Sequence, residues 1–148
     1  MKARELKIGN YVYTGTDEDD NPVPCKITAL DKFNVYWDGN KTSVNFIEPI
    51  PITPEWLEKM GFSYLKVEGI TRIGDDFQGY ADEGDTHNWT LKVKANERTE
   101  GFAFEIVKWG DGPYTFVNQW LRIRVKYLHD IQNIFHALTG QELNINIG

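Results

Sequence analysis

The residues best suited to bind a metal or attack a substrate are few in this chain of 148 residues. His129 and His136 are seven positions apart in a segment with helical periodicity. They share a face but lie about 10 Å apart along the axis, at a rise of about 1.5 Å per residue. Two imidazoles that bind one zinc ion lie much closer together. We therefore predict no shared metal site at these histidines.

Nucleophiles and acidic clusters also lack the partners that catalysis or metal binding requires. Cys25 lies on a predicted strand without a nearby histidine, which favours a small buried residue over a nucleophile. The acidic segment 17–20 lacks the glycine and the bidentate glutamate of an EF-hand loop. The sequence contains no GxSxG, P-loop or dinucleotide-binding motif. We therefore predict no catalytic, cofactor-binding or metal-binding residues, and a protein that is not an enzyme.

The polar face of the C-terminal segment is the first candidate binding surface. By helical periodicity, His129, Gln132 and Asn133 point away from the apolar stripe of that segment. An ordinary solvated helix face is the simpler interpretation. The alternative is a weakly charged surface for an unknown protein partner, formed by these three residues.

The basic segment 86–128 is the second candidate binding surface. It holds seven Lys and Arg against four Asp and Glu, a net charge of +3, whereas the whole chain carries −6. Arg122, Arg124 and Lys126, with the tryptophans of the same segment, resemble the basic and aromatic surfaces that bind nucleic acid. The tryptophans are explained more simply as core residues, and the acidic remainder of the chain would repel a phosphate backbone.

The stretch 47–62, IEPIPITPEWLEKMGF, separates two unlike parts of the chain. Its alternating prolines favour a stiff extended crossing. Thr53 is a good N-cap, Pro54 suits the first helical position, and Gly61 suits the left-handed residue that ends a helix. The sequence thus predicts a short helix over residues 54–60, with Trp56 buried and joining the two parts.

The part before this joint, residues 1–50, has the pattern of a small β unit. Residues 25–29 alternate apolar and polar side chains, which is the period of a half-buried strand. The triplet 38–40, Asp-Gly-Asn, separates two strand-like segments and is a strong hairpin signal. Short strands at this spacing predict an SH3-like β-barrel unit.

The part from residue 51 to 148 combines further strands with the longest helix. Its strand candidates lie at 62–68, 69–73, 77–81, 89–93, 102–106, 114–117, 120–123 and 143–147. We expect a mainly antiparallel sheet, followed by a helix over residues 125–138 whose apolar stripe covers one sheet face. The fold class is therefore α+β. One compact domain that contains both parts is the alternative to two units.

Three segments of the chain, ELKIGNYV, IEPIPITPEWLEKMGF and YLHDIQNIFHALTGQEL, carry a family resemblance. They resemble an uncharacterised family of small proteins common in Bacteroidota genomes and their prophages. That family typically shows an "EPIPLTEEWL…GF" joint and a "VHQLQNLYFALTGEEL" C-terminal helix. In this chain, His136 stands where an aromatic residue is usual and Asp130 where glutamine is usual. The resemblance implies origin and architecture but no reaction, and the segment 63–124 lies outside it.

The composition predicts a folded protein of the cell interior. A hydrophobic content of 41% and an aromatic content of 14% are enough to bury a core. No apolar run approaches the ~18 residues of a membrane span, and MKARELKIGN lacks the apolar core of a signal peptide. The lone Cys25 fits a reducing compartment. We therefore expect a cytoplasmic, non-enzymatic accessory or protein-interaction module of bacterial or prophage origin, with nucleic-acid binding through segment 86–128 as the alternative.

Overall fold

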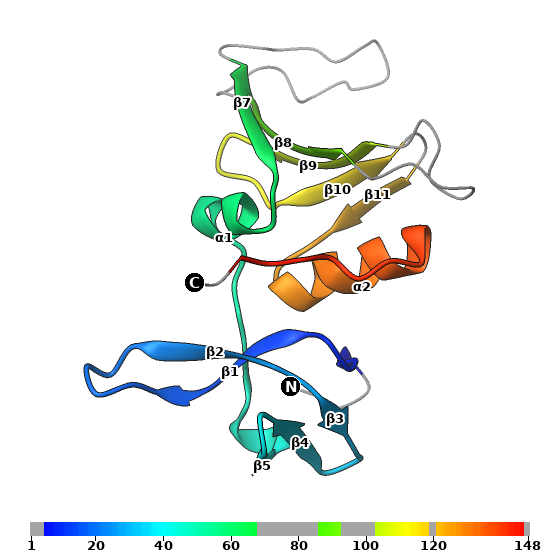
Figure 1. The fold of residues 1–148 in the computed structure, drawn as a ribbon. Coiled ribbons are helices and arrows are strands. Elements are labelled where there is room, and N and C mark those ends of the chain that lie inside the picture. The colour runs from blue at the N-terminus through cyan, green and yellow to red at the C-terminus, as the bar shows by residue number, and fades with distance from the viewer. Residues whose placement is uncertain (1–4, 68–85, 93–102, 119–120, 147–148) are drawn as a thin grey trace. The chain divides into compact units, whose positions relative to one another are not determined.

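A computed structural model of the chain describes residues 5–67, 86–92, 103–118 and 121–146 (Figure 1). The chain divides into two compact units, Met1–Ile52 with Tyr127–Leu143, and Thr53–Lys126 with Asn144–Gly148. The α+β class, the antiparallel sheets and the C-terminal helix are as predicted. That helix belongs to the first unit, however, whereas the sequence pattern assigned residues 125–138 to the second.

The first unit contains two three-stranded antiparallel sheets and a short 3-10 helix. The sheet of order β2-β1-β6 consists of β1 (Tyr11–Thr16), β2 (Pro22–Lys26) and β6 (Glu48–Pro49). The sheet of order β3-β4-β5 consists of β3 (Ala29–Leu30), β4 (Asn34–Trp37) and β5 (Asn40–Ser43), and η2 (Val44–Phe46) follows it. The described strands of this unit therefore close no barrel.

The hairpin predicted at the Asp-Gly-Asn triplet is confirmed. Trp37 pairs with Asn40, and the two residues between them have left-handed φ angles, 45° at Asp38 and 79° at Gly39. Positive φ at both central positions is the pattern of a type I′ turn, whose twist suits a β-hairpin. Strands from both sheets contribute to one apolar core, which contains Leu6, Val12, Ile27, Val35, Val44 and Ile47.

The C-terminal helix of the first unit is α2 (Leu128–Thr139), which begins later than the predicted residue 125. Its start is fixed at Tyr127, whose backbone N–H donates to Oδ2 of Asp130 at 3.0 Å. It ends at Gly140, whose φ of 72° is the left-handed geometry that glycine adopts freely. Three residues of the predicted apolar stripe are buried, namely Leu128, Ile131 and Phe135. No helix of the described residues is both long and apolar enough to cross a membrane.

The second unit contains a short helix and a five-stranded antiparallel sheet. The helix is α1 (Pro54–Lys59). The strand order β11-β10-β9-β8-β7 is a simple meander. Its strands are β7 (Ser63–Val67), β8 (Thr86–Lys92), β9 (Ala103–Trp109), β10 (Thr115–Asn118) and β11 (Leu121–Arg124). Strand candidates at 69–73 and 77–81, together with Trp120 and Ile147, lie outside the described residues, and residues 143–146 form no strand.

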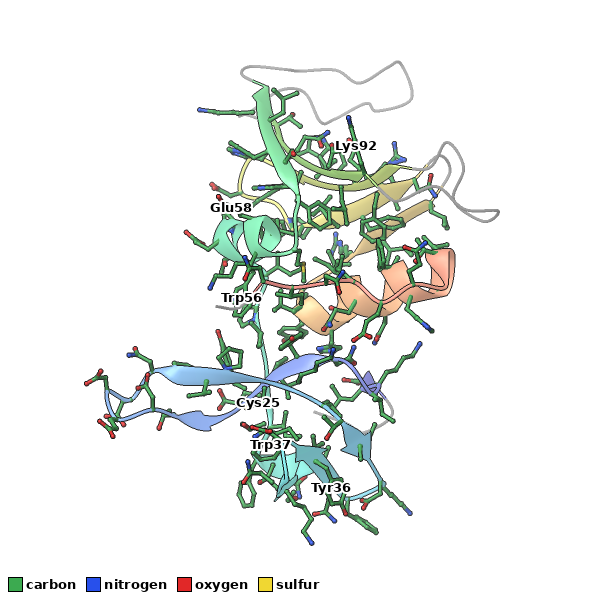
Figure 2. All side chains as sticks on the ribbon, in the orientation of Figure 1. Cys25, Tyr36, Trp37, Trp56, Glu58 and Lys92 are labelled. Atoms are coloured by element: carbon green, nitrogen blue, oxygen red, sulfur yellow. The ribbon has the colours of Figure 1, made fainter. Side chains whose placement is uncertain are left out.

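The capping of α1 is confirmed, but the prediction for Trp56 is wrong. The hydroxyl of Thr53 accepts the Trp56 backbone N–H at 3.2 Å, and Gly61 ends the helix with a φ of 96°. Trp56, which is labelled in Figure 2, is only half-buried. The Lys59 ammonium lies 4.7 Å from its ring centroid. So short a helix buries a narrow stripe, and here Leu57 and Met60 occupy it. Trp56 at the edge of that stripe keeps contact with water.

The largest buried side chains of the second unit's sheet lie on one of its faces. Directly paired strand residues share a face, so Trp89, Ile106, Phe116 and Ile123 form one row across β8 to β11. Phe104 lies on the same face, with its ring centroid 4.4 Å from that of Phe116. Toward β11 this row reaches the sheet edge, where Ile123 is 39% exposed. The apolar row is therefore deeply buried in its middle and open at its end.

Candidate functional site

The predicted partner surface on α2 is largely buried inside the first unit. His129 and Gln132 are only 3% and 5% exposed, so the expectation that they face outward is wrong. The Gln132 side chain bonds backbone groups at the start of β1: Oε1 accepts the Tyr11 N–H, and Nε2 donates to the Gly9 carbonyl, each at 2.9 Å. Gln132 therefore acts like one peptide unit of a neighbouring strand.

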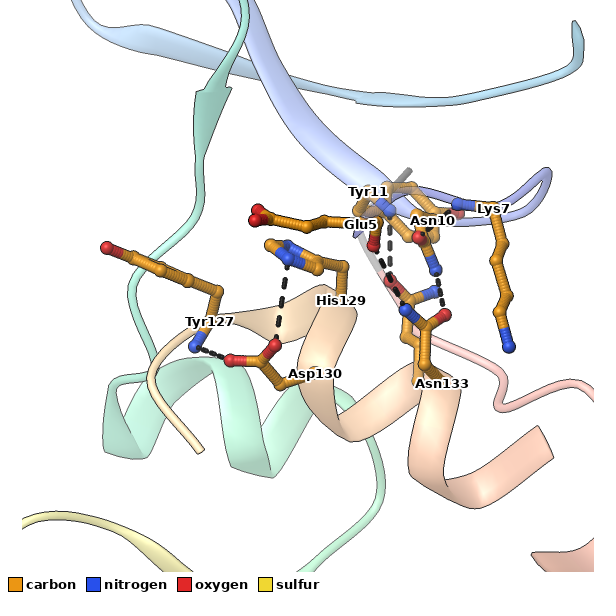
Figure 3. A network of polar contacts seen from close by, with 9 residues as sticks. Glu5, Lys7, Asn10, Tyr11, Tyr127, His129, Asp130 and Asn133 are labelled. Carbon is orange, nitrogen blue, oxygen red and sulfur yellow. Dashed lines mark hydrogen bonds and ion pairs between the residues drawn. The ribbon is translucent and has the colours of Figure 1, made fainter. Parts of the chain in front are cut away.

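Asn133 continues this network along the same N-terminal segment (Figure 3). Its Oδ1 accepts from Nδ2 of Asn10 at 2.9 Å, and its Nδ2 donates to the Glu5 carbonyl at 3.3 Å. Asn10 Oδ1 in turn accepts the Lys7 backbone N–H at 2.7 Å. The polar face of the helix is thus used to hold residues 5–11. Helical periodicity identified that face correctly but did not reveal what covers it.

His129 is the buried titratable group of this network. Burial lowers the pKa of its imidazole, while the carboxylates of Asp130 and Glu5 act in the opposite direction. Nε2 lies 3.6 Å from Oδ1 of Asp130, and the Tyr127 ring stacks on the imidazole at a centroid distance of 5.6 Å. Desolvation is the larger effect, so the neutral imidazole is favoured in the folded protein. His136 is exposed, so the two helix histidines lie in unlike surroundings.

The described residues form neither a metal-binding site nor a nucleophilic site. Among them, no group of three His, Cys, Asp or Glu residues could hold a metal ion. Cys25 is half-buried on β2, with its Sγ 2.9 Å from Oγ1 of Thr14. A pocket of about 330 Å³ in the first unit is bordered by Asn10, Gln132 and Asn133, whose amides already bond within the network.

In the predicted nucleic-acid surface, the basic residues are exposed, but Trp89 does not lie beside them. Arg122, Arg124 and Lys126 are exposed. Ile123, which pairs with Phe116, belongs to the face of Trp89, so the arginines beside it point to the opposite face. These arginines therefore lie on the sheet face opposite to Trp89 and to the other aromatic rings of β7 and β8.

A larger pocket lies in the second unit. Its volume is about 770 Å³. Its lining comes from α1, from β7, β8 and β9, and from the turn before β10, and includes Phe62, Tyr64, His87, Trp89, Lys108 and Tyr114. We call it the aromatic pocket. Its size is that of pockets that bind small molecules and cofactors.

Four rings of the aromatic pocket contact one another. The ring centroid of Trp89 lies 5.1 Å from that of Tyr64, 5.5 Å from that of Tyr114 and 6.0 Å from that of His87. Trp89 is only 5% exposed, whereas Tyr64 is 51% exposed. A buried indole thus supports flanking rings that a ligand can reach, and offset ring pairs of this kind are favourable.

Polar groups around these rings are few and fixed. The Tyr64 hydroxyl lies 2.6 Å from Nδ1 of His87, and the Lys108 ammonium lies 5.5 Å from the Tyr114 ring centroid. Burial raises the pKa of the Tyr114 phenol, and the nearby Glu55 carboxylate adds to this shift. The phenol therefore stays protonated and can donate a hydrogen bond. Glu58 also lines the pocket and supplies its carboxylate.

The pocket could not be predicted from the sequence, although two of its rings lie on predicted strands. Tyr64 lies on one predicted strand, and Trp89 lies on another. Their direct pairing is a matter of register, which a single sequence does not provide. No family model, curated protein or solved structure significantly matches the chain.

Proposed function

We propose that the protein is a non-enzymatic binding module and that the aromatic pocket of its second unit is the binding site. The observation that supports this most directly is the set of rings around Trp89, with Tyr64 half-exposed beside a buried indole. A half-exposed ring that packs on a buried one offers an apolar surface that a ligand can cover. The aromatic pocket is thus a specific site for the accessory or interaction role expected from the sequence.

The lining of the pocket favours binding over catalysis. Its rings offer stacking surfaces, and Lys108 and Glu58 offer one cationic and one anionic group. The hydroxyl of Tyr64 and Nδ1 of His87 already bond to each other. Side chains engaged in this way hold a recognition surface in shape, which supports selectivity for a ligand.

A fragment titration tests the proposed site. Indole, phenol and benzoate would be added to the isotopically labelled protein, and amide shifts would be followed by NMR. Shifts are expected at Tyr64, Trp89 and Lys108, and Tyr64→Ala should weaken them. Leu65→Ala is the matched control, because Leu65 is the next residue of β7, is 64% exposed, and points to the other sheet face. Equal loss in both variants, or shifts elsewhere only, would contradict the proposal.

Nucleic-acid binding by the basic residues is the second candidate function. Arg122 and Arg124 are exposed and share one face of the edge strand β11, which supports a line of contacts to a phosphate backbone. Retention on duplex DNA, measured at rising salt, tests this function. The double variant Arg122→Ala, Arg124→Ala should lose retention, whereas Tyr64→Ala should not.

We also propose that the first unit is SH3-like and that the chain belongs to the Bacteroidota and prophage family it resembles, with a cytoplasmic location. The core that joins Val12 of β1 to Val35 of β4 supports a bent, barrel-like arrangement. The half-buried Cys25, which contacts Thr14, suits a reducing compartment. Nuclear Overhauser contacts among β1 to β6 would test the barrel, and fractionation of a bacterial host would test the location.

A further inference from the structure

Two neighbouring rows of side chains cross the sheet at the aromatic pocket. Tyr64, Trp89 and Ile106 occupy directly paired positions of β7, β8 and β9. Two residues further along, Lys66, His87 and Lys108 are directly paired and form another row. Residues two apart on a strand share a face, so both rows lie on the pocket side of the sheet. A line of rings therefore runs beside a line of basic side chains.

We infer that the aromatic pocket takes a nucleobase-bearing anion, with the base against the Tyr64 ring, which packs on Trp89, and the phosphate beside Lys108. This inference rests on the proposed function, because it names a ligand class for the same site. Bases stack on aromatic side chains whatever their sequence, since every base has a π-face. A lysine ammonium is a compact charge that binds phosphate.

The separation of the two rows fits such a ligand. Strand residues rise by roughly 3.4 Å each, so neighbouring rows on one face are about 7 Å apart. A ribose can bridge a gap of this order between its base and its 5′-phosphate. His87, bonded through Nδ1 to the Tyr64 hydroxyl, lies at the junction of the two rows. A ring and a charge held at this distance select a molecule that carries both.

Acidic groups near the site restrict how the ligand lies. Glu58 lines the pocket, and its carboxylate repels a phosphate but accepts N–H and O–H donors of a base or a ribose. Glu105 lies on the opposite sheet face, because it alternates with Ile106. Lys108 is the lysine among the residues that line the pocket, and it is therefore the favoured place for the phosphate. The whole chain carries a net charge of −6, so electrostatic attraction of a phosphate is confined to the basic side chains at the pocket.

The same chemistry is offered by a free nucleotide and by a single-stranded nucleic acid. The decisive titration uses AMP, adenosine, ribose 5-phosphate and an eight-residue oligodeoxyadenylate, with dissociation constants from NMR shifts. AMP should bind more tightly than adenosine and than ribose 5-phosphate, and loss of the base should weaken binding roughly tenfold, as expected for one stacked base. Tighter binding of the oligonucleotide per nucleotide, with a steep salt dependence, would identify a strand as the source.

Variants assign the two halves of the ligand to the two rows. Lys108→Met should reduce AMP affinity to that of adenosine, and Lys108→Arg should restore the difference. Tyr64→Ala should weaken AMP and adenosine alike and leave ribose 5-phosphate unchanged. Leu65→Ala should change none of these values. Circular dichroism melts would show that each variant is folded before its affinity is compared.

Negative outcomes separate this inference from the proposed function. Equal affinity for AMP and adenosine, or for AMP and ribose 5-phosphate, would overturn the nucleobase-bearing anion. If indole binds at Tyr64 and neither AMP nor the oligonucleotide does, the ligand class is wrong and the binding pocket stands. If neither indole nor any nucleotide shifts pocket resonances, both the ligand class and the pocket's binding role are wrong.

Discussion

The polar face of α2 and the aromatic pocket of the second unit use their side chains in opposite ways. On α2, Gln132 is 5% exposed, and the oxygen and the nitrogen of its side-chain amide both bond backbone groups of residues 9–11. In the pocket, Tyr64 is 51% exposed and presents half of its ring to water. Polar residues on a helix indicated a surface, yet they form an internal joint. The tryptophans were interpreted as core residues, and Trp89 is buried, but its neighbour Tyr64 borders an open site.

The largest expected effect tests the packing beneath the α2 network. Phe135 is 5% exposed, and Phe135→Ala should lower the free energy of unfolding by about 3–5 kcal/mol, since it removes a buried ring and leaves a cavity. Urea unfolding followed by tryptophan fluorescence measures this. A loss below about 1 kcal/mol would mean that the helix is held by its polar bonds alone.

The next effect tests whether the polar face is an internal joint. Gln132→Ala should cost about 2–4 kcal/mol, because it leaves the Tyr11 N–H and the Gly9 carbonyl without partners in a buried place. His136→Ala is the control on the same helix, since His136 is exposed, and should cost about 0.5 kcal/mol or less. Similar urea midpoints for the two variants would mean that Gln132 is a surface residue and not part of an internal joint.

The pH dependence of stability tests the burial of His129. Its pKa is lowered in the folded protein from an ordinary value of 6.5, so the unfolded chain takes up the proton more readily. Stability should therefore be full above pH 6.5 and fall as the pH drops from 6.5 toward the folded pKa. His129→Leu should flatten the thermal-midpoint profile over that window, whereas His136→Leu should leave its slope unchanged. An equal slope in wild type and His129→Leu would contradict this.

The smallest stability effect belongs to the open pocket. Tyr64→Ala should cost only about 0.5–1.5 kcal/mol, the range of the aromatic pairs it loses with Trp89 and His87. Urea unfolding beside the Leu65→Ala control measures the difference. A cost near that of Phe135→Ala would show that Tyr64 is a core residue, and the contrast between the two regions would disappear.

Local signals in the sequence predicted the local structure well. Thr53 and Gly61 bounded α1, the Asp38-Gly39 pair formed the hairpin turn, and the stripe through Ile131 was buried. Each of these depends on residues close together in the chain. Backbone geometry and helical period act over that range, so one sequence is enough to predict them.

The parts that were missed depend on partners far apart in the chain. Gln132 lies 121 residues from Tyr11, with which it bonds. Trp89 and Tyr64 meet only because β7 and β8 pair in one register. Periodicity says which side chains share a face, but it does not say what that face meets. The role of α2 and the position of the pocket therefore required the structure.

The pairing of β7 with β8 also constrains how the length of the chain can vary. Tyr64 pairs with Trp89 and Lys66 with His87, while Ser63 and Leu65 point to the other side. A single residue inserted just before Ser63 would exchange the two sets and put Ser63 where the phenol stands, and the loss of one residue there would put Leu65 in that place. Insertions of one residue inside β7 should therefore be poorly tolerated in proteins that keep this pocket, whereas substitutions at Leu65 should accumulate freely.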